Sequence, residues 1–297
     1  MVKYYSANDY YKDIFGEKVY KLALKGGTTC PTRDGTKGCR GCIFCSEAGS
    51  GDFAADTIDE AILRLSAKQT GRKYIAYFQT FTGTYGDAER FRELYTAAAR
   101  DDRICGLSIA TRPDCLPDEM LCLLSDLAGI KPLMVELGLQ TIHEKTADFI
   151  RRGYNLPVFE EAVAKLREIP ADVVVHLILG LPGETKEDML ASVRYLNGCD
   201  IQGVKLQLLH VLAGTDLGEL YLSGAFGTPD GSFPFSLPEY TDLVCDCLQT
   251  LRKDIAVHRI TGDAPKRLLL SPKWSGNKKL VLNTIQKRLA ERGVTHQ

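Results

Sequence analysis

The chain has 297 residues, of which 44% are hydrophobic and 25% are charged, and its formal net charge is -1. This composition is typical of a globular protein and excludes a collagen-like, fibrous or disordered chain. No segment approaches the roughly 18 consecutive apolar residues of a membrane span, and the first residues lack the apolar stretch of a secretory signal. We therefore expect a cytoplasmic protein without a membrane partner.

Apolar runs of strand length recur along the chain, and a capped amphipathic segment follows each of them. This alternation is typical of repeated βα units that build a parallel sheet. Several runs are apolar almost throughout, as expected for strands that are covered on both faces. The six predicted strands are Val19 to Leu24, Tyr74 to Phe78, Gly106 to Ala110, Pro132 to Leu137, Val173 to Leu179, and Val204 to Leu209.

Helix start signals lie between and after these strands. A Ser or Thr followed three residues later by an acidic residue can form a reciprocal cap at a helix N-terminus. A further helix is predicted from Asn277 to Arg292. The three capping pairs are Thr57 with Glu60, Thr185 with Asp188, and Ser236 with Glu239.

Six βα units are fewer than the eight of a closed barrel. We therefore predict an α/β fold, a partial (β/α)6 TIM-like barrel with N- and C-terminal extensions that cover the edges of the sheet. The predicted barrel domain with its N-terminal extension covers residues 1–255, and a basic C-terminal extension packed on the barrel covers residues 256–297.

The end of the chain is basic although the whole chain is nearly neutral. From Lys266 onward there are eight cations against Glu291, a local balance of 8 − 1 = +7. This asymmetry fits a phosphate-binding surface and equally a solvated basic helix face. The cations are Lys266, Arg267, Lys273, Lys278, Lys279, Lys287, Arg288 and Arg292.

Ten cysteines are present, and four of them fall within a short loop after the first predicted strand: Cys30, Cys39, Cys42 and Cys45. The other six lie in hydrophobic segments, where free cysteine behaves as a small apolar residue. In an intracellular protein, clustered cysteines favour a metal centre over disulfides. The loop also follows the carboxyl end of a strand, where such sheets carry their chemistry.

The spacing within this loop allows three interpretations. Cys39, Cys42 and Cys45 are each three apart, as in a ferredoxin cluster for which Cys30 would be the fourth ligand. Alternatively, three cysteines hold three irons and leave a fourth iron open. A closed tetrahedral zinc site is the third possibility. The loop alone does not choose among them.

The loop, Cys-Pro-x-Arg-Asp-Gly-Thr-Lys-Gly-x-x-Gly-Cys-x-Phe-Cys, resembles the signature of the YhcC-type group of radical-SAM enzymes. The resemblance implies that Cys30, Cys42 and Cys45 bind a 4Fe-4S cluster. Its open iron would hold S-adenosylmethionine, which is cleaved to a 5′-deoxyadenosyl radical. Cys39 departs from the pattern, because the group ordinarily has no cysteine there.

The resemblance continues downstream and implies contacts with S-adenosylmethionine. The segment Tyr77 to Thr82 corresponds to the one that recognises the methionine amino group, and Arg112 would bind the carboxylate or form a structural ion pair. The segments from Glu136 and from His176 would contact the ribose and sulfonium, and the adenine. The predicted cofactor contacts are Phe44, Gln79, Thr80, Arg112, Glu136, Gln140, Ile178, Gly180, Gly183, Leu209 and His210.

The loop and the segment from Glu136 to Gln140 also resemble the radical-SAM portion of the Elongator catalytic subunit, which acts on wobble uridine in tRNA. The resemblance implies tRNA as the substrate and a reductant such as flavodoxin or ferredoxin as a partner. The basic tail and the segment His258 to Asp263 agree with a nucleic-acid partner, although a seventh strand explains that segment equally well. Two alternatives stay open: a radical-SAM enzyme acting on a small metabolite or peptide, and a non-enzymatic iron-sulfur or zinc protein.

Overall fold

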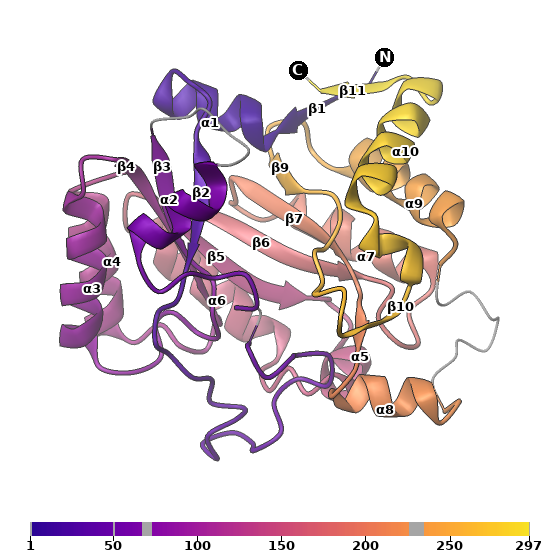
Figure 1. Ribbon diagram of the computed structural model, residues 1–297, viewed down its shortest axis with the longest axis horizontal. Helices are drawn as coiled ribbons and strands as arrows, with labels where there is room; N and C mark the ends of the chain where they lie inside the picture. Colours follow the sequence, from indigo (N-terminus) through magenta and orange to yellow (C-terminus); the bar gives the residue numbers. More distant parts are fainter. Residues whose placement is uncertain (1, 50, 67–72, 226–234, 297) are drawn as a thin grey trace.

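The computed structural model describes residues 2–49, 51–66, 73–225 and 235–296. In this part of the chain nine parallel strands form one sheet, with helices around its outer face (Figure 1). Six consecutive strands of this sheet confirm the prediction. They are β2 (Tyr20–Leu24), β3 (Tyr74–Phe78), β4 (Ile104–Thr111), β5 (Leu133–Gln140), β6 (Ala171–Leu179) and β7 (Gly203–Leu208).

The terminal extensions add strands to a single edge of this sheet. β9 (Ala256–Arg259) pairs with β7, β1 (Val2–Ser6) pairs with β9, and β11 (Val294–His296) pairs with β1. The two ends of the chain therefore lie side by side in neighbouring strands (Figure 1). The segment beyond Ile255 begins with a true seventh parallel strand, which continues the sheet beyond the six predicted units.

The predicted helix starts are present. Thr185 and Ser236 form complete capping boxes, whereas Thr57 provides one half, because the Glu60 carboxylate accepts from the backbone N–H of Asp56 instead. The helices are α1 (Ala7–Phe15), α2 (Ile58–Ser66), α3 (Ala88–Arg100), α4 (Asp118–Ala128), α5 (Glu144–Phe149), α6 (Leu156–Arg167), α7 (Lys186–Leu196), α8 (Asp216–Leu222), α9 (Leu237–Thr250) and α10 (Lys278–Glu291). A short 3-10 helix, Lys273–Gly276, and a two-stranded sheet of β8 (Val211–Leu212) with β10 (Leu269–Ser271) complete the set.

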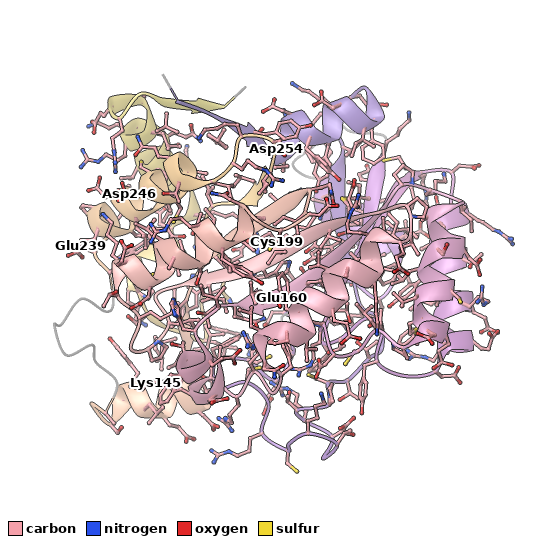
Figure 2. The ribbon with its side chains drawn as sticks, turned by 180° about the vertical axis from the view of Figure 1, so that it is seen from behind. Lys145, Glu160, Cys199, Glu239, Asp246 and Asp254 are labelled. Carbon is pink, nitrogen blue, oxygen red and sulfur yellow. The ribbon has the colours of Figure 1, made fainter. Side chains whose placement is uncertain are left out.

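The outer layer of helices buries the main apolar core against the sheet. On α3 the ring of Phe91 stacks on Tyr95 with centroids 5.5 Å apart, and Tyr95 in turn contacts Phe78 of β3. Seen from behind, α6 with Glu160 and α9 with Asp246 cross the back of the sheet (Figure 2). These helices pack on the outer face of the sheet. The inner faces of the strands line a cavity instead.

The basic tail folds back on α9. Arg288 of α10 forms a two-pronged ion pair with Asp242, at 2.6 and 2.9 Å, and Arg292 lies 2.6 Å from Asp246. These two cations of the +7 tail therefore serve packing, since acidic residues of α9 neutralise them. In the described part of the chain, no helix combines the length and the apolar character needed to cross a bilayer.

The helix-to-sheet packing predicts a large effect of Phe91→Ala. Phe91 is fully buried, and deletion of such a ring costs about 3–5 kcal/mol of unfolding free energy. Leu222→Ala is the control, because Leu222 is 71% exposed and should change stability by less than about 0.5 kcal/mol. Urea unfolding followed by circular dichroism measures both. Equal midpoints for the two variants would show that the α3 face is not part of the core.

Candidate active site

A cavity of about 750 Å³ lies inside the sheet. Residues from the cysteine loop line one part of it, and residues from the inner faces of the central strands line the rest. At the far end Tyr11 of α1 contributes to the wall. The cavity thus connects the predicted metal loop with the interior of the barrel.

Three of the four loop cysteines face this cavity. Cys30, Cys42 and Cys45 line it, whereas Cys39 is exposed and lies outside the described lining. Burial and the neighbouring Cys45 thiol raise the pKa of Cys42 to about 12. A bound cation is what deprotonates such a thiol, so these side chains have the chemistry of metal ligands.

The number of cysteines at the cavity matches the protein ligands of a cluster with one open iron. Within the described ranges, no three His, Cys, Asp or Glu side chains are arranged to hold one metal ion. A 4Fe-4S cluster has a larger frame, and each thiolate binds a different iron atom. The three cysteines around one cavity therefore fit a cluster.

Arg33 holds the cysteine loop in shape, a role that the sequence analysis missed. Its guanidinium donates to the carbonyls of Cys45 at 2.9 Å and Ser46 at 2.7 Å, and it lies 5.5 Å from the ring centre of Phe81. A Cβ on Gly41 would stand 2.9 Å from Nε of Arg33, so glycine leaves room for the guanidinium. The arginine and the glycine within the loop were the available signal.

The two predicted cofactor contacts after β3, Gln79 and Thr80, lie in different surroundings. Gln79 lines the cavity as predicted, but Thr80 lies outside the described lining. The Thr80 hydroxyl accepts the backbone N–H of Gly26 at 3.0 Å, and its carbonyl accepts the Thr28 hydroxyl at 2.8 Å. Thr80 thus holds the chain that leads from β2 to Cys30.

Arg112 lines the cavity, but an internal carboxylate occupies its fork. Nε and Nη2 donate to the two oxygens of Asp114, both at 2.9 Å, and Lys37 also binds Asp114. Of the two alternatives, the structure contains the structural ion pair. The same fork could bind a methionine carboxylate only if Asp114 were displaced.

Glu136 is the centre of a polar network inside the barrel. Its carboxylate is fully buried and accepts from Lys21 at 2.6 Å, Ser108 at 2.7 Å and His176 at 2.6 Å, and it contacts Lys205. Burial opposes its ionisation, but Lys205 and Lys21 hold the pKa of Glu136 well below its usual range. The residue predicted to contact the cofactor therefore also links β5 to four other strands, β2, β4, β6 and β7.

Two further inward side chains, Tyr77 and Gln207, complete this network. Lys205 donates to the Tyr77 hydroxyl at 2.9 Å, and Gln207 lies 3.2 Å from Nδ1 of His176. Burial lowers the pKa of Lys205 to about 7 and, together with the Lys205 charge, that of His176 to about 4. The sequence signal was the presence of ionisable residues within otherwise apolar strand runs, which marks side chains that face a polar interior.

Most of the remaining residues that were predicted to contact the cofactor lie in or directly after β5, β6 and β7. Gln140, with φ +64°, ends β5, and its amide lies 3.3 Å from the Tyr154 hydroxyl. Phe44, Gln140, Ile178, Leu209 and His210 line the cavity together, whereas Gly180 and Gly183 are outside the described lining. Gly180 and Gly183 have φ angles of +93° and +82°, so they shape the turn after β6.

Comparison with known proteins agrees with this site. The model of the radical SAM superfamily matches residues 30–196, from the first predicted cluster ligand to the end of α7, and the model of the Radical_SAM C-terminal domain matches residues 201–291. The chain therefore belongs to the radical SAM superfamily. Enzymes of this family use a 4Fe-4S cluster and S-adenosylmethionine and need a reductant, and this chain is such an enzyme.

Within the superfamily, the chain is similar to protein YtqA of Bacillus subtilis, with 43% identity over 98% of this chain and 91% of YtqA. It is 33% identical to protein YhcC of Escherichia coli, over 94% of this chain and 90% of YhcC. The resemblance to the YhcC-type group is thereby confirmed.

A solved structure shares the fold. The Elongator protein Elp3 of Methanocaldococcus infernus superposes with a TM-score of 0.68 at 18% identity and covers 93% of this chain. The chain spans 63% of that archaeal chain. The common element is thus the partial barrel with its extensions.

The interior network predicts that Glu136→Gln destabilises the protein by about 3–5 kcal/mol, because the change leaves two buried lysines without their counter-charge. Glu89→Gln is the matched control, since the Glu89 side chain is 80% exposed and should change the unfolding free energy by less than about 0.5 kcal/mol. Urea unfolding at neutral pH compares the two. A loss below about 1 kcal/mol in Glu136→Gln would mean that the network does not hold the strands together.

Proposed function

We propose that this chain is a radical SAM enzyme that modifies the wobble uridine of tRNA. One comparison carries the choice of substrate: the tRNA uridine(34) acetyltransferase of Dehalococcoides mccartyi is 28% identical over 55% of this chain and 34% of that enzyme. The similarity of the archaeal Elp3 fold supports the same reading. We assign no acetyl transfer, because the similarity covers only part of the acetyltransferase.

In this proposal Cys30, Cys42 and Cys45 hold the cluster, and Arg33 keeps their loop in place. When bound and reduced, the cluster supplies the electron that splits S-adenosylmethionine into methionine and a 5′-deoxyadenosyl radical. The chain encloses this chemistry: Gln79, Gln140 and other lining residues orient the cofactor. The walls exclude water, which would otherwise compete for the reactive groups. Flavodoxin or ferredoxin would deliver the electron.

Part of the basic tail lies in the right place to meet RNA. Lys278 and Pro265 line the cavity, and Lys266 and Arg267 follow Pro265 directly and are exposed. Arg288 and Arg292, by contrast, are paired with acidic residues of α9. We therefore assign phosphate contact to Lys266 and Arg267, at the side of the tail nearest the cavity.

A small metabolite or peptide is the competing substrate class, and the same cavity could admit either. The other alternative, a non-enzymatic iron-sulfur or zinc protein, is excluded by membership of an enzyme family. Cluster chemistry and tRNA chemistry are therefore tested separately.

The cysteine assignment predicts different outcomes for two conservative variants. After anaerobic reconstitution and reduction with dithionite, the wild type should release 5′-deoxyadenosine from S-adenosylmethionine. Cys42→Ser should bind less iron and release none, because one of three ligands is lost. Cys39→Ser should match the wild type in iron content and product, since Cys39 is exposed and lies outside the described lining. Loss of the cluster in Cys39→Ser would make Cys39 a ligand.

The substrate assignment predicts that tRNA from cells lacking this protein carries a changed nucleoside at the wobble uridine, measured by mass spectrometry of digested tRNA. Complementation with Lys266→Glu should restore the nucleoside less well than complementation with Lys287→Glu. In vitro, Lys266→Glu should reduce the salt dependence of tRNA retention by about one charge.

Lys287→Glu is a matched control because Lys287 belongs to the same tail, its side chain is 80% exposed, and it lies outside the described cavity lining. An unchanged nucleoside profile in the deletion strain would reject tRNA and leave the metabolite or peptide alternative. Equal tRNA retention by the two variants would reject the assignment of Lys266 to a phosphate.

A further inference from the structure

Arg259 is a cavity-lining cation with an unusual environment. It is the last residue of β9, is half-buried, and pairs in register with Lys205 of β7. Its guanidinium forms no hydrogen bond, ion pair or ring contact with any residue in the described part of the chain. The other cations of the described lining all have partners.

Those partners are specific for each cation. Lys21 and Lys205 bind Glu136, Arg64 binds Glu60, Arg112 binds Asp114, Lys278 binds Asp263, and Arg33 binds two backbone carbonyls. The carboxylates near Arg259 are therefore engaged elsewhere. Asp263 is held by Lys278 at 2.5 Å, and Glu136 is shared by two lysines and His176.

Arg259 adds a permanent positive charge to this part of the cavity lining. Lys21 and Lys205 share the one carboxylate of Glu136, and Arg259 pairs in register with Lys205. The charge of Arg259 acts on its neighbours, because it contributes to the lowered pKa of Lys205 and of His176. A guanidinium stays charged at any pH at which proteins fold, so an anion that enters the cavity beside Arg259 meets a permanent positive charge.

The chemistry of the balancing group follows from the donor. A guanidinium presents a planar fork that matches the two oxygens of a carboxylate or the oxygens of a phosphate. A neutral polar group would leave the buried charge uncompensated. Arg112, the residue predicted to bind the methionine carboxylate, already has its fork filled by Asp114, so it does not remove the need for Arg259.

We propose that Arg259, with Lys205 and Lys21 behind it, forms an oxyanion-binding site at the barrel end of the cavity. The site takes a carboxylate or phosphate group. Two sources share this chemistry: the carboxylate of S-adenosylmethionine, and an anionic group on the substrate. The inference takes one point from the proposed function, namely that the reaction takes place in this cavity. It holds for any class of substrate.

The test measures anion binding to the cluster-loaded protein without any RNA. Sodium acetate and inorganic phosphate are titrated against sodium chloride at matched ionic strength, and the thermal midpoint is followed. The wild type should gain stability from acetate or phosphate beyond the effect of chloride, because a ligand that binds only the folded state stabilises it. Arg259→Met should bind these anions at least fivefold more weakly, and Arg259→Lys should keep part of the effect.

Arg100→Met is the control, because Arg100 is an exposed arginine at the end of α3 and lies outside the described lining. It should keep the full anion effect. In chloride alone, Arg259→Met should melt no lower than the wild type, since the half-buried guanidinium has no hydrogen bond or ion pair to lose within the described residues. A clearly lower midpoint would reveal a structural partner for Arg259 and overturn the proposal.

Addition of S-adenosylmethionine distinguishes the two sources. If saturating S-adenosylmethionine abolishes the anion effect, the site binds the methionine carboxylate; if the effect persists, the site is free for an anionic group of the substrate. Either result supports an oxyanion site. The proposal fails if acetate and phosphate act no differently from chloride, or if Arg259→Met responds like the wild type, as it would if the anions bound the open iron. An unchanged tRNA profile would leave this result untouched.

Discussion

The buried carboxylate of Glu136 is the constraint on which the interior of this protein depends. It receives donors from Lys21 of β2, Ser108 of β4, His176 of β6 and Lys205 of β7, so one side chain ties strands on both sides of β5. An open parallel sheet has no last strand to close it into a barrel, and a shared buried ion network supplies inward cohesion. The same network makes the interior polar, because every member must have its partner inside.

That polar interior decides where the chemistry can take place. The cavity is lined by the three cysteines at the loop and by the Glu136 network on the strands, and under the proposed function cofactor and substrate bind between them. Rigid strands carry the floor, whereas Arg33 and Thr80 brace the loop through backbone contacts. A radical needs a chamber that limits access of water, and under the proposed function these walls form it.

The net charge of the C-terminal tail does not predict what its individual cations do in the structure. The +7 balance of the tail suggested one basic surface, but its members have different tasks in the structure. Arg288 and Arg292 pair with acidic residues on α9, and Lys278 lies beside the cavity bound to Asp263. The remaining exposed cations, Lys266 and Arg267 among them, are those that can meet a phosphate. The composition gives only the number of charged residues. Which of the cations are neutralised depends on acidic partners that are distant in the sequence.

The sequence by itself determined the six βα units, the capped helices and the cysteine loop, because hydrophobic period, cap chemistry and ligand spacing are local properties of the chain. It also determined the superfamily, since the motifs occur in order. Only the tertiary structure decided that Arg112 pairs with Asp114, that Glu136 joins four strands, and that Arg259 faces the cavity without a partner in the described residues. Those outcomes depend on which side chains meet across strands that are separated by many residues, and no local pattern encodes such distances.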